Sequence, residues 1–145
     1  MTRINAAIEP KELCDQHLLA EYREITRVPT QAKNWYDKGM KGKLPEDFRL
    51  GTGHVKFFYN KVKYLHLRFL ALIQEMIRRG NEANIEDDRF LLLKDTEIYN
   101  DWQETKEARD LLYQRIMERL QGKEIKYYKE KISHKVYTGK IFCLY

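Results

Sequence analysis

Residues 53–80, GHVKFFYNKVKYLHLRFLALIQEMIRRG, carry the longest amphipathic pattern in the chain and decide its fold. Apolar side chains recur at steps of three and four residues, which predicts an α-helix with one buried face. The helix is predicted to start at Thr52 or Gly53. It should end at Gly80, because glycine readily takes the left-handed conformation that closes a helix. We expect this segment to be the central core helix and its aromatic stripe to be core packing. The apolar positions are Val55, Phe58, Tyr59, Val62, Leu65, Phe69, Leu72, Ile73 and Met76.

Two more helices are predicted, one before and one after this segment. The first begins near Pro10 and runs to about Val28, where Pro29 ends or bends it. The other covers about residues 104–121 and stops before Gly122. The stretches 30–53 and 81–100 are expected to be mostly irregular, and no strand pair is convincing. We therefore expect an all-α fold, a compact single domain over residues 1–145 built on three main helices with long irregular connections.

The bulk composition is that of a globular protein, with 43% hydrophobic and 34% charged residues. No apolar run approaches the roughly 18 residues that a membrane span needs. The start, MTRINAAIEP, lacks the apolar stretch of a signal peptide. We therefore expect a soluble, cytoplasmic monomer with no membrane partner. Cys14 and Cys143 lie at opposite ends of the chain, so neither a disulfide scaffold nor a zinc site is expected.

The net charge of +5 is unevenly distributed along the chain. Basic residues outnumber acidic ones in residues 31–80 and 111–145, whereas acidic residues predominate between them. Clustered basic residues are typical of a nucleic-acid-binding surface, although a solvated surface of mixed charge is an equal alternative. The tail from Lys123 is rich in lysine and tyrosine, which can contact phosphates and stack on bases. An amphipathic tail packed on the helices is the other interpretation, and both can hold at once.

Several common catalytic and metal-binding patterns are absent from the sequence. It contains no glycine-rich phosphate loop, no HExxH helix and no serine nucleophile elbow. We therefore expect neither a cofactor nor a metal ion. For the histidine at the start of the central helix, a capping or hydrogen-bonding role is expected rather than a catalytic one. The histidines are scattered, with no pair four residues apart: His17, His54, His66 and His134.

One group that remains available for covalent chemistry is the chain terminus. Thr2 is small enough for the initiator Met1 to be removed, which would expose a primary α-amine. The unperturbed pKa of such an amine is about 7.7–8.0, so it is neutral more often than a lysine at physiological pH. Cations nearby, such as Arg3 and Arg23, would lower its pKa further. A neutral amine attacks aldehydic carbons to form imines.

Three stretches around this terminus closely resemble one enzyme family. They are MTRIN (residues 1–5), DQHLLAEYRE (residues 15–24) and GTGHVKFFYNK (residues 51–61). Together they resemble the pyrimidine-dimer DNA glycosylases of T-even phages, also called endonuclease V of that phage group. The similarity continues through the Arg-Arg-Gly sequence at residues 78–80, and it recurs more weakly at residues 115–120 and 126–128.

The resemblance implies a compact three-helix protein that needs no metal and acts on lesion-bearing or abasic double-stranded DNA. In the family, the threonine amine attacks the sugar C1′ atom at the damaged base and forms a protein–DNA imine. A helix carboxylate then assists β-elimination, which nicks the strand. The family binds a kinked duplex and flips out the base opposite the lesion.

Carried over to this chain, Thr2 matches the nucleophile and Glu24 the essential carboxylate. The remaining matches are basic or polar residues expected to contact DNA. They are Arg3, Gln16, His17, Arg23, Arg27, Arg115, Arg119 and Lys126. Gln16, Arg23 and Arg27 are separated by steps of seven and four, so one side of the first helix would present all three. An ionised Glu24 beside those cations can take up a proton or stabilise positive charge on the sugar.

The sequence departs from the family pattern after the third helix. Glu124 and Ile125 stand where the family has a tryptophan and a tyrosine near the lesion. Loss of an aromatic stacking surface is worth about 1–3 kcal/mol per base. Cyclobutane pyrimidine dimers are the expected lesion. The alternatives are an abasic-site lyase or a glycosylase for another modified base on the same scaffold, and a non-catalytic DNA-binding protein.

Overall fold

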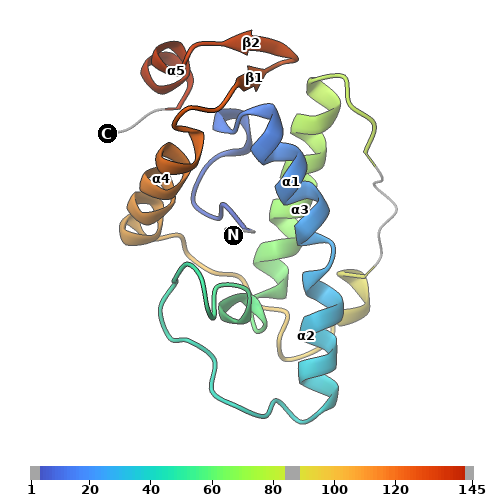
Figure 1. Ribbon diagram of the computed structural model, residues 1–145. Helices are drawn as coiled ribbons and strands as arrows, with labels where there is room; N and C mark the ends of the chain where they lie inside the picture. Colours follow the sequence, from blue (N-terminus) through green and yellow to red (C-terminus); the bar gives the residue numbers. More distant parts are fainter. Residues whose placement is uncertain (1–3, 84–88, 143–145) are drawn as a thin grey trace.

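The computed structural model describes residues 4–83 and 89–142, and it confirms the all-α class (Figure 1). The longest helices are α3 and α4, and α1 packs against α3. Among the described residues, no helix is long and apolar enough to cross a membrane. The elements, in chain order, are η1 (Pro10–Glu12), α1 (Asp15–Ile25), α2 (Val28–Asp37), η2 (Lys56–Phe58), α3 (Val62–Arg78), η3 (Leu91–Leu93), α4 (Lys106–Leu120), β1 (Ile125–Tyr127), β2 (Glu130–Ile132), α5 (His134–Val136) and the π-helical turn η4 (Tyr137–Ile141).

The first predicted helix is in fact three separate elements, η1, α1 and α2. Pro29, which was predicted to end or bend the first helix, instead lies in the first turn of a separate helix, α2. Proline is well suited to that position because its missing N–H has no partner in a first turn in any case. The prediction of an irregular segment from residue 30 was therefore wrong for residues 30–37. It was right for the loop that follows them.

The central helix ends where predicted but begins later. The Gly80 N–H donates to the Ile77 carbonyl at 2.9 Å and the Asn81 N–H donates to the Met76 carbonyl at 2.9 Å, which is a Schellman closure. At the other end, the chain forms the short η2 turn and breaks before α3. The first amides of α3 then find partners in a distant loop, since the Val62 N–H donates to the Ile98 carbonyl at 3.1 Å. The apolar periodicity runs across the break and so conceals it.

The third predicted helix is α4, and its start has a clear local cause. The Thr105 hydroxyl accepts a hydrogen bond from the Ala108 N–H at 3.1 Å, which satisfies one of the otherwise unpaired first amides. Gly122 follows the helix with a φ of 68°.

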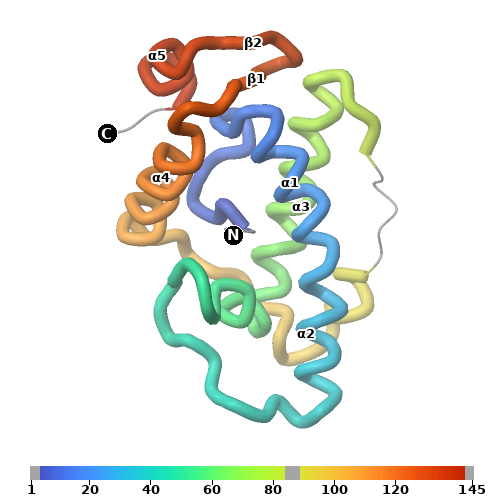
Figure 2. Tube along the Cα trace, in the orientation of Figure 1, coloured from blue at the N-terminus to red at the C-terminus, as the bar shows by residue number. Residues whose placement is uncertain are grey.

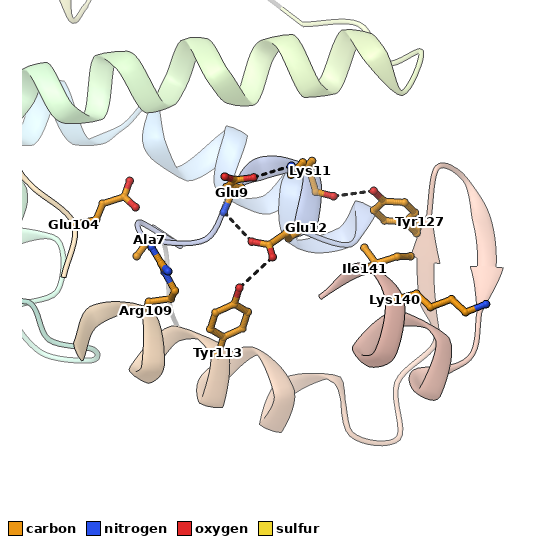
Figure 3. Close-up of a pocket in the computed structure, with 10 residues that line it drawn as sticks. All are labelled: Ala7, Glu9, Lys11, Glu12, Glu104, Arg109, Tyr113, Tyr127, Lys140 and Ile141. Atoms are coloured by element: carbon orange, nitrogen blue, oxygen red, sulfur yellow. Dashed lines mark hydrogen bonds and ion pairs between the residues drawn. The ribbon is translucent and has the colours of Figure 1, made fainter. Parts of the chain in front are cut away.

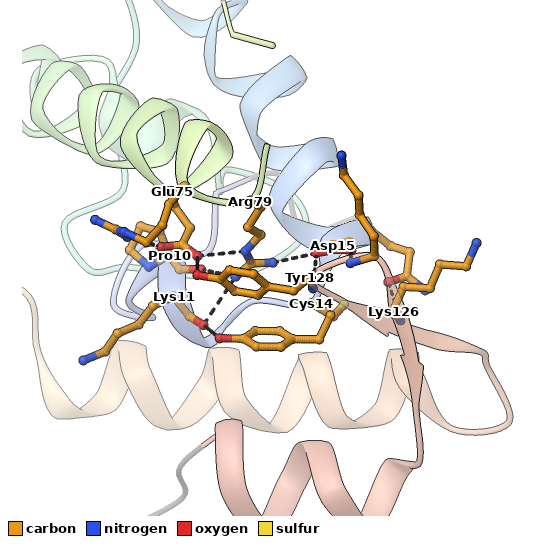
Figure 4. A network of polar contacts seen from close by, with 12 residues as sticks. Pro10, Lys11, Cys14, Asp15, Glu75, Arg79, Lys126 and Tyr128 are labelled. Atoms are coloured by element: carbon orange, nitrogen blue, oxygen red, sulfur yellow. Dashed lines mark hydrogen bonds and ion pairs between the residues drawn. The ribbon is translucent and has the colours of Figure 1, made fainter. Parts of the chain in front are cut away.

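An antiparallel hairpin, β1 and β2, was missed by the sequence analysis. Its two turn residues, Tyr128 and Lys129, both have positive φ (52° and 67°), the pattern of a type I′ turn. Such turns favour Asn-Gly, so Tyr-Lys gives no hairpin signal. The Asp15 carboxylate at the start of α1 compensates by accepting hydrogen bonds from both turn amides, at 3.1 and 2.7 Å. Arg79 lies over the rings of Tyr127 and Tyr128 and also bonds Asp15 at 2.9 Å (Figure 4).

The tail after the hairpin packs onto the helices. Tyr137 and Phe142 are buried, with their rings stacked. The Tyr137 hydroxyl donates to the Glu12 carbonyl at 2.6 Å and accepts from the Cys14 N–H at 3.1 Å. The packed-tail interpretation is therefore confirmed for residues 134–142, whereas Cys143 lies outside the described residues.

The first described residues lie in the interior of the molecule. Figure 2 shows the first described residues, in blue, between α4 on one side and α1 and α3 on the other. Ile4, Ala6 and Ile8 are fully buried, so residues 4–8 form part of the hydrophobic core.

Candidate active site

The beginning of the chain is held by a histidine ring. The Ile4 N–H donates a 3.1 Å hydrogen bond to Nε2 of His54, and both groups are buried. Nδ1 of the same ring lies 2.8 Å from the Arg49 carbonyl, which can only accept, so Nδ1 carries the proton and Nε2 is free to accept. Burial lowers the pKa of His54, although the Arg49 carbonyl opposes the shift. The neutral ring is therefore the form that binds Ile4.

The next residue, Asn5, is tied to α1 by a hydrogen bond to the acidic member of a buried ion pair. The Asn5 side-chain amide donates to Oε1 of Glu21 at 3.0 Å. Arg68 of α3 binds the same carboxylate through two nitrogens, Nε at 2.6 Å and Nη2 at 3.0 Å. Such a two-point contact fixes the geometry as well as neutralising the charge. Burial alone would lower the pKa of Arg68, but the Glu21 carboxylate raises it, so the guanidinium stays charged.

The same network holds the backbone beyond Asn5. Nη1 of Arg68 donates to the carbonyls of Ala6 (2.9 Å) and Ile8 (2.7 Å), and the Tyr64 hydroxyl also donates to Ala6 at 2.6 Å. Burial raises the pKa of Tyr64, so its hydroxyl remains a donor. We call His54, Glu21, Tyr64 and Arg68 the N-terminal clasp. The clasp satisfies buried polar groups of residues 4–8 that would otherwise destabilise a core segment.

The predicted carboxylate lies one turn further along α1 from the clasp. Glu24 follows Glu21 by three residues, and His17 precedes Glu21 by four, so the three residues share a face of the helix. The Glu24 side chain is only 19% exposed, and its Oε1 pairs with Nη1 of Arg27 at 3.2 Å. Burial lowers the pKa of His17, and the nearby Arg119 of α4 lowers it further. The charge of Arg119 on α4 therefore acts on His17 of α1.

The other predicted contacts in the described residues fall into three groups. Arg23 and Arg27 have exposed side chains where α1 ends, although Arg27 lies beyond the helix, between α1 and α2. The single-helix geometry assumed for Gln16, Arg23 and Arg27 is therefore wrong. Arg115 and Arg119 lie on α4.

Gln16 and Lys126 lie at the hairpin. The Gln16 side-chain amide donates to the Glu124 carbonyl, and its oxygen accepts from the Lys126 N–H at 3.2 Å. Gln16 therefore docks β1 onto α1. The ammonium of Lys126 is 3.8 Å from the Glu124 carboxylate. Thr2 and Arg3 lie outside the described residues.

A cavity of about 590 Å³ between η1, α4 and the C-terminal segment contains none of the predicted site residues (Figure 3). Two of its acidic groups have partners in its own wall: Glu12 accepts from the Tyr113 hydroxyl at 3.1 Å, and Glu9 pairs with Lys11 at 3.1 Å. The described part of the chain contains no group of three or more histidine, cysteine or acidic side chains placed to hold a metal ion.

Sequence reasoning missed most of the clasp. Arg68 stands on the buried face of α3 between Leu65 and Leu72, and Glu21 stands on the buried face of α1 between Leu18 and Ile25. A charged residue in the middle of an apolar stripe is a signal for a buried ion pair, because a lone buried charge is very costly. The presence of two such residues of opposite charge, in different helices, was the signal that could have predicted this ion pair.

A comparison with protein families is consistent with this arrangement. A family model described as pyrimidine dimer DNA glycosylase matches residues 1–89. The matched region is more than half of the chain, and it includes Glu24 together with every residue of the clasp. The chain therefore belongs to the pyrimidine dimer DNA glycosylase family.

Proposed function

We propose that this DNA repair glycosylase is bifunctional, and that its nucleophile is the α-amine of Thr2 after Met1 has been removed. The observation that carries the proposal is the placement of Ile4 and Asn5. Asn5 is bound to Glu21, one helical turn before Glu24. Two residues span at most about 7 Å, so only a short length of chain separates the buried Ile4 nitrogen from residue 2. The proposal requires that the terminal amine reach the Glu24 carboxylate over this length.

The proposed reaction has two stages. In the first, the amine lone pair forms a bond to C1′ while the glycosidic bond breaks and its electrons leave with the base. Loss of the proton from nitrogen and opening of the sugar ring then give an imine. In the second stage, a base removes a proton from C2′, the C3′–O bond breaks, and the 3′ phosphate leaves with the electron pair. The imine makes this elimination possible because it withdraws electrons from C2′.

Glu24 is the residue that we assign to the proton transfers. Its carboxylate is largely shielded from water and is paired with the exposed Arg27. A carboxylate in this setting can stabilise positive charge developing at C1′ and accept the C2′ proton. The flanking cations Arg23, Arg27 and Arg119 would contact DNA phosphates. The affinity for DNA should therefore fall as the salt concentration rises.

The decisive experiment traps and locates the covalent intermediate. The purified protein is mixed with duplex DNA that carries an abasic site or a cyclobutane dimer, and borohydride is added. Intact mass should show a single adduct, and peptide mapping should place it on the N-terminal peptide that starts at Thr2. Acetylation of the α-amine should abolish the adduct. An adduct on a lysine, or one that survives acetylation, would contradict the proposal.

One feature of the hairpin favours a second substrate class. Where the family has a tryptophan and a tyrosine, Ile125 is buried and Glu124 pairs with Lys126 and Lys131. This side of the site therefore lacks that aromatic pair, and another modified pyrimidine or a plain abasic site is the alternative substrate. Cleavage rates on dimer-containing, abasic and otherwise modified duplexes separate the two. Nicking of abasic but never of dimer DNA favours the alternative.

A further inference from the structure

The contact between Ile4 and His54 is the point at which the clasp comes closest to the chain terminus. Residues 5–8 are held independently of it, by Glu21, Tyr64 and Arg68. The hydrogen bond from Ile4 to His54, in contrast, constrains the backbone just before that segment. Its loss should therefore loosen the backbone at residue 4, whose side chain stays in the core, and leave the rest of the buried segment in place.

The His54 ring is itself held rigidly. Nδ1 is anchored on the Arg49 carbonyl, and the rings of Phe48 and Phe58 pack edge-on at centroid distances of 5.4 and 5.7 Å. Gly53, just before it, has a φ of +88°. A Cβ at that position would lie 3.1 Å from Cδ of Arg49 and 3.2 Å from Cγ of Pro45. The backbone turn that presents the ring thus depends on glycine, and Nε2 is a fixed acceptor.

We propose that His54 is a positioning residue for the reaction: by accepting the Ile4 N–H, it fixes the direction in which the terminal amine leaves the core. This inference rests on the proposed function, because it concerns the Thr2 amine as nucleophile. The amine is two residues from a backbone atom whose place is set by Nε2. A displacement of about 1 Å in a reacting group can cost about 100-fold in rate.

The chain offers a conservative replacement and a matched control. The His54→Gln variant carries a side-chain oxygen that can accept the Ile4 N–H, so it should keep most of the rate, whereas His54→Leu removes the acceptor. His66 provides the control: its ring, which is half-buried whereas that of His54 is buried, bonds the Tyr99 hydroxyl at 2.8 Å and stacks on Phe90. It lies on α3 and has no contact with residues 4–8 in the described network. His66→Leu therefore removes a comparable ring without disturbing the terminus.

The test measures imine formation separately from binding and stability. Single-turnover borohydride trapping on an abasic duplex gives the rate, and binding to a duplex with a tetrahydrofuran abasic analogue gives Kd without chemistry. Thermal unfolding is recorded for each protein. We expect His54→Leu to lower the trapping rate by about tenfold or more. Its Kd should stay near that of the unsubstituted protein, and its melting temperature should fall no further than that of His66→Leu.

The outcomes separate this inference from the proposed function. If the unsubstituted protein forms no adduct through its terminal amine, the proposed function fails and His54 has nothing to position. If it does form the adduct, and His54→Leu reacts as fast as the unsubstituted protein or only as slowly as His66→Leu, the positioning role is refuted. Equal losses in His54→Leu and His54→Gln would also refute it, because the hydrogen-bond acceptor would then not matter.

Discussion

Replacing Arg68 by methionine tests whether the clasp holds the chain start in the core. The substitution keeps an unbranched apolar stem on α3 and removes the guanidinium. That guanidinium makes two hydrogen bonds to Glu21 and one each to the carbonyls of Ala6 and Ile8. All of these groups are buried, so none of them gains a water molecule in exchange.

The expected loss of stability is set by the buried Glu21 carboxylate, which the substitution leaves without its guanidinium partner. Breaking a buried ion pair from one side leaves an uncompensated charge and costs about 3–5 kcal/mol. For a chain of this length, a change of 1 kcal/mol moves the melting temperature by about 2–4 °C, so the expected fall is roughly 6–20 °C. Combining Arg68→Met with Glu21→Gln removes the stranded charge. The double variant should be more stable than the sum of the single changes predicts, by about 1–3 kcal/mol.

The assay is urea unfolding followed by far-ultraviolet circular dichroism, with the midpoint and slope both reported. Arg78→Met is the matched control: Arg78 also lies on α3 and pairs with Glu75, but its side chain is 60% exposed. Glu75 is buried but keeps its ion pair with Arg79, and the Arg78 end of the pair is exposed, so this variant should lose only about 0–1 kcal/mol. A loss below about 1 kcal/mol for Arg68→Met, or one equal to the control, would refute the idea that the clasp is a desolvated network on which the structure depends.

Three further outcomes are expected. The Glu24→Gln variant should bind an abasic duplex with little change in affinity, measured by gel-shift, but should nick it about 100-fold or more slowly in single-turnover cleavage. An unchanged nicking rate would favour a non-catalytic DNA-binding protein. Burial lowers the pKa of His17 and His54 from 6.5 in the folded protein, so the unfolded chain binds more protons below pH 6.5. The contribution of these histidines to the free energy of unfolding should be fully present above pH 6.5 and should be lost as the pH falls below that value. An unchanged urea midpoint between pH 7.5 and 5.5 would contradict the assignment of His17 and His54 as neutral in the folded protein. The Lys129→Gly variant should have a free energy of unfolding about 1 kcal/mol higher, because glycine adopts a φ of 67° without strain. A lower urea midpoint would show that the backbone at Lys129 is not strained.

Local patterns were sufficient to predict the main helices and the residues on them. The apolar periodicity of α3 and the glycine after it each act within a few residues, so they could be predicted from the sequence. The same is true of Glu24 and His17, which share a face of α1. The family assignment also rests on short stretches, and residues 1–89 bear it out.

Tertiary contacts decided the boundaries that were missed. The break before α3 exists because carbonyls of the loop at residues 98–100 bind the first amides of the helix. The hairpin exists with an unfavourable turn because Asp15, more than a hundred residues earlier, accepts both turn amides. Neither partner can be identified from a local window, and so neither element could be predicted.

For the candidate site, too, some features were determined by the sequence and others only by the tertiary structure. The sequence by itself determined which residues carry charge and hydrogen-bonding groups, and that His17 and Glu24 share a face of α1. Only the folded chain brought Ile4 to His54, Asn5 to Glu21, and Arg68 to the carbonyls of residues 6 and 8. These bonds join residues far apart in the chain. Their partners are fixed by how α1, α3 and the buried chain start pack together, because a buried polar group must find a partner wherever the packing places one.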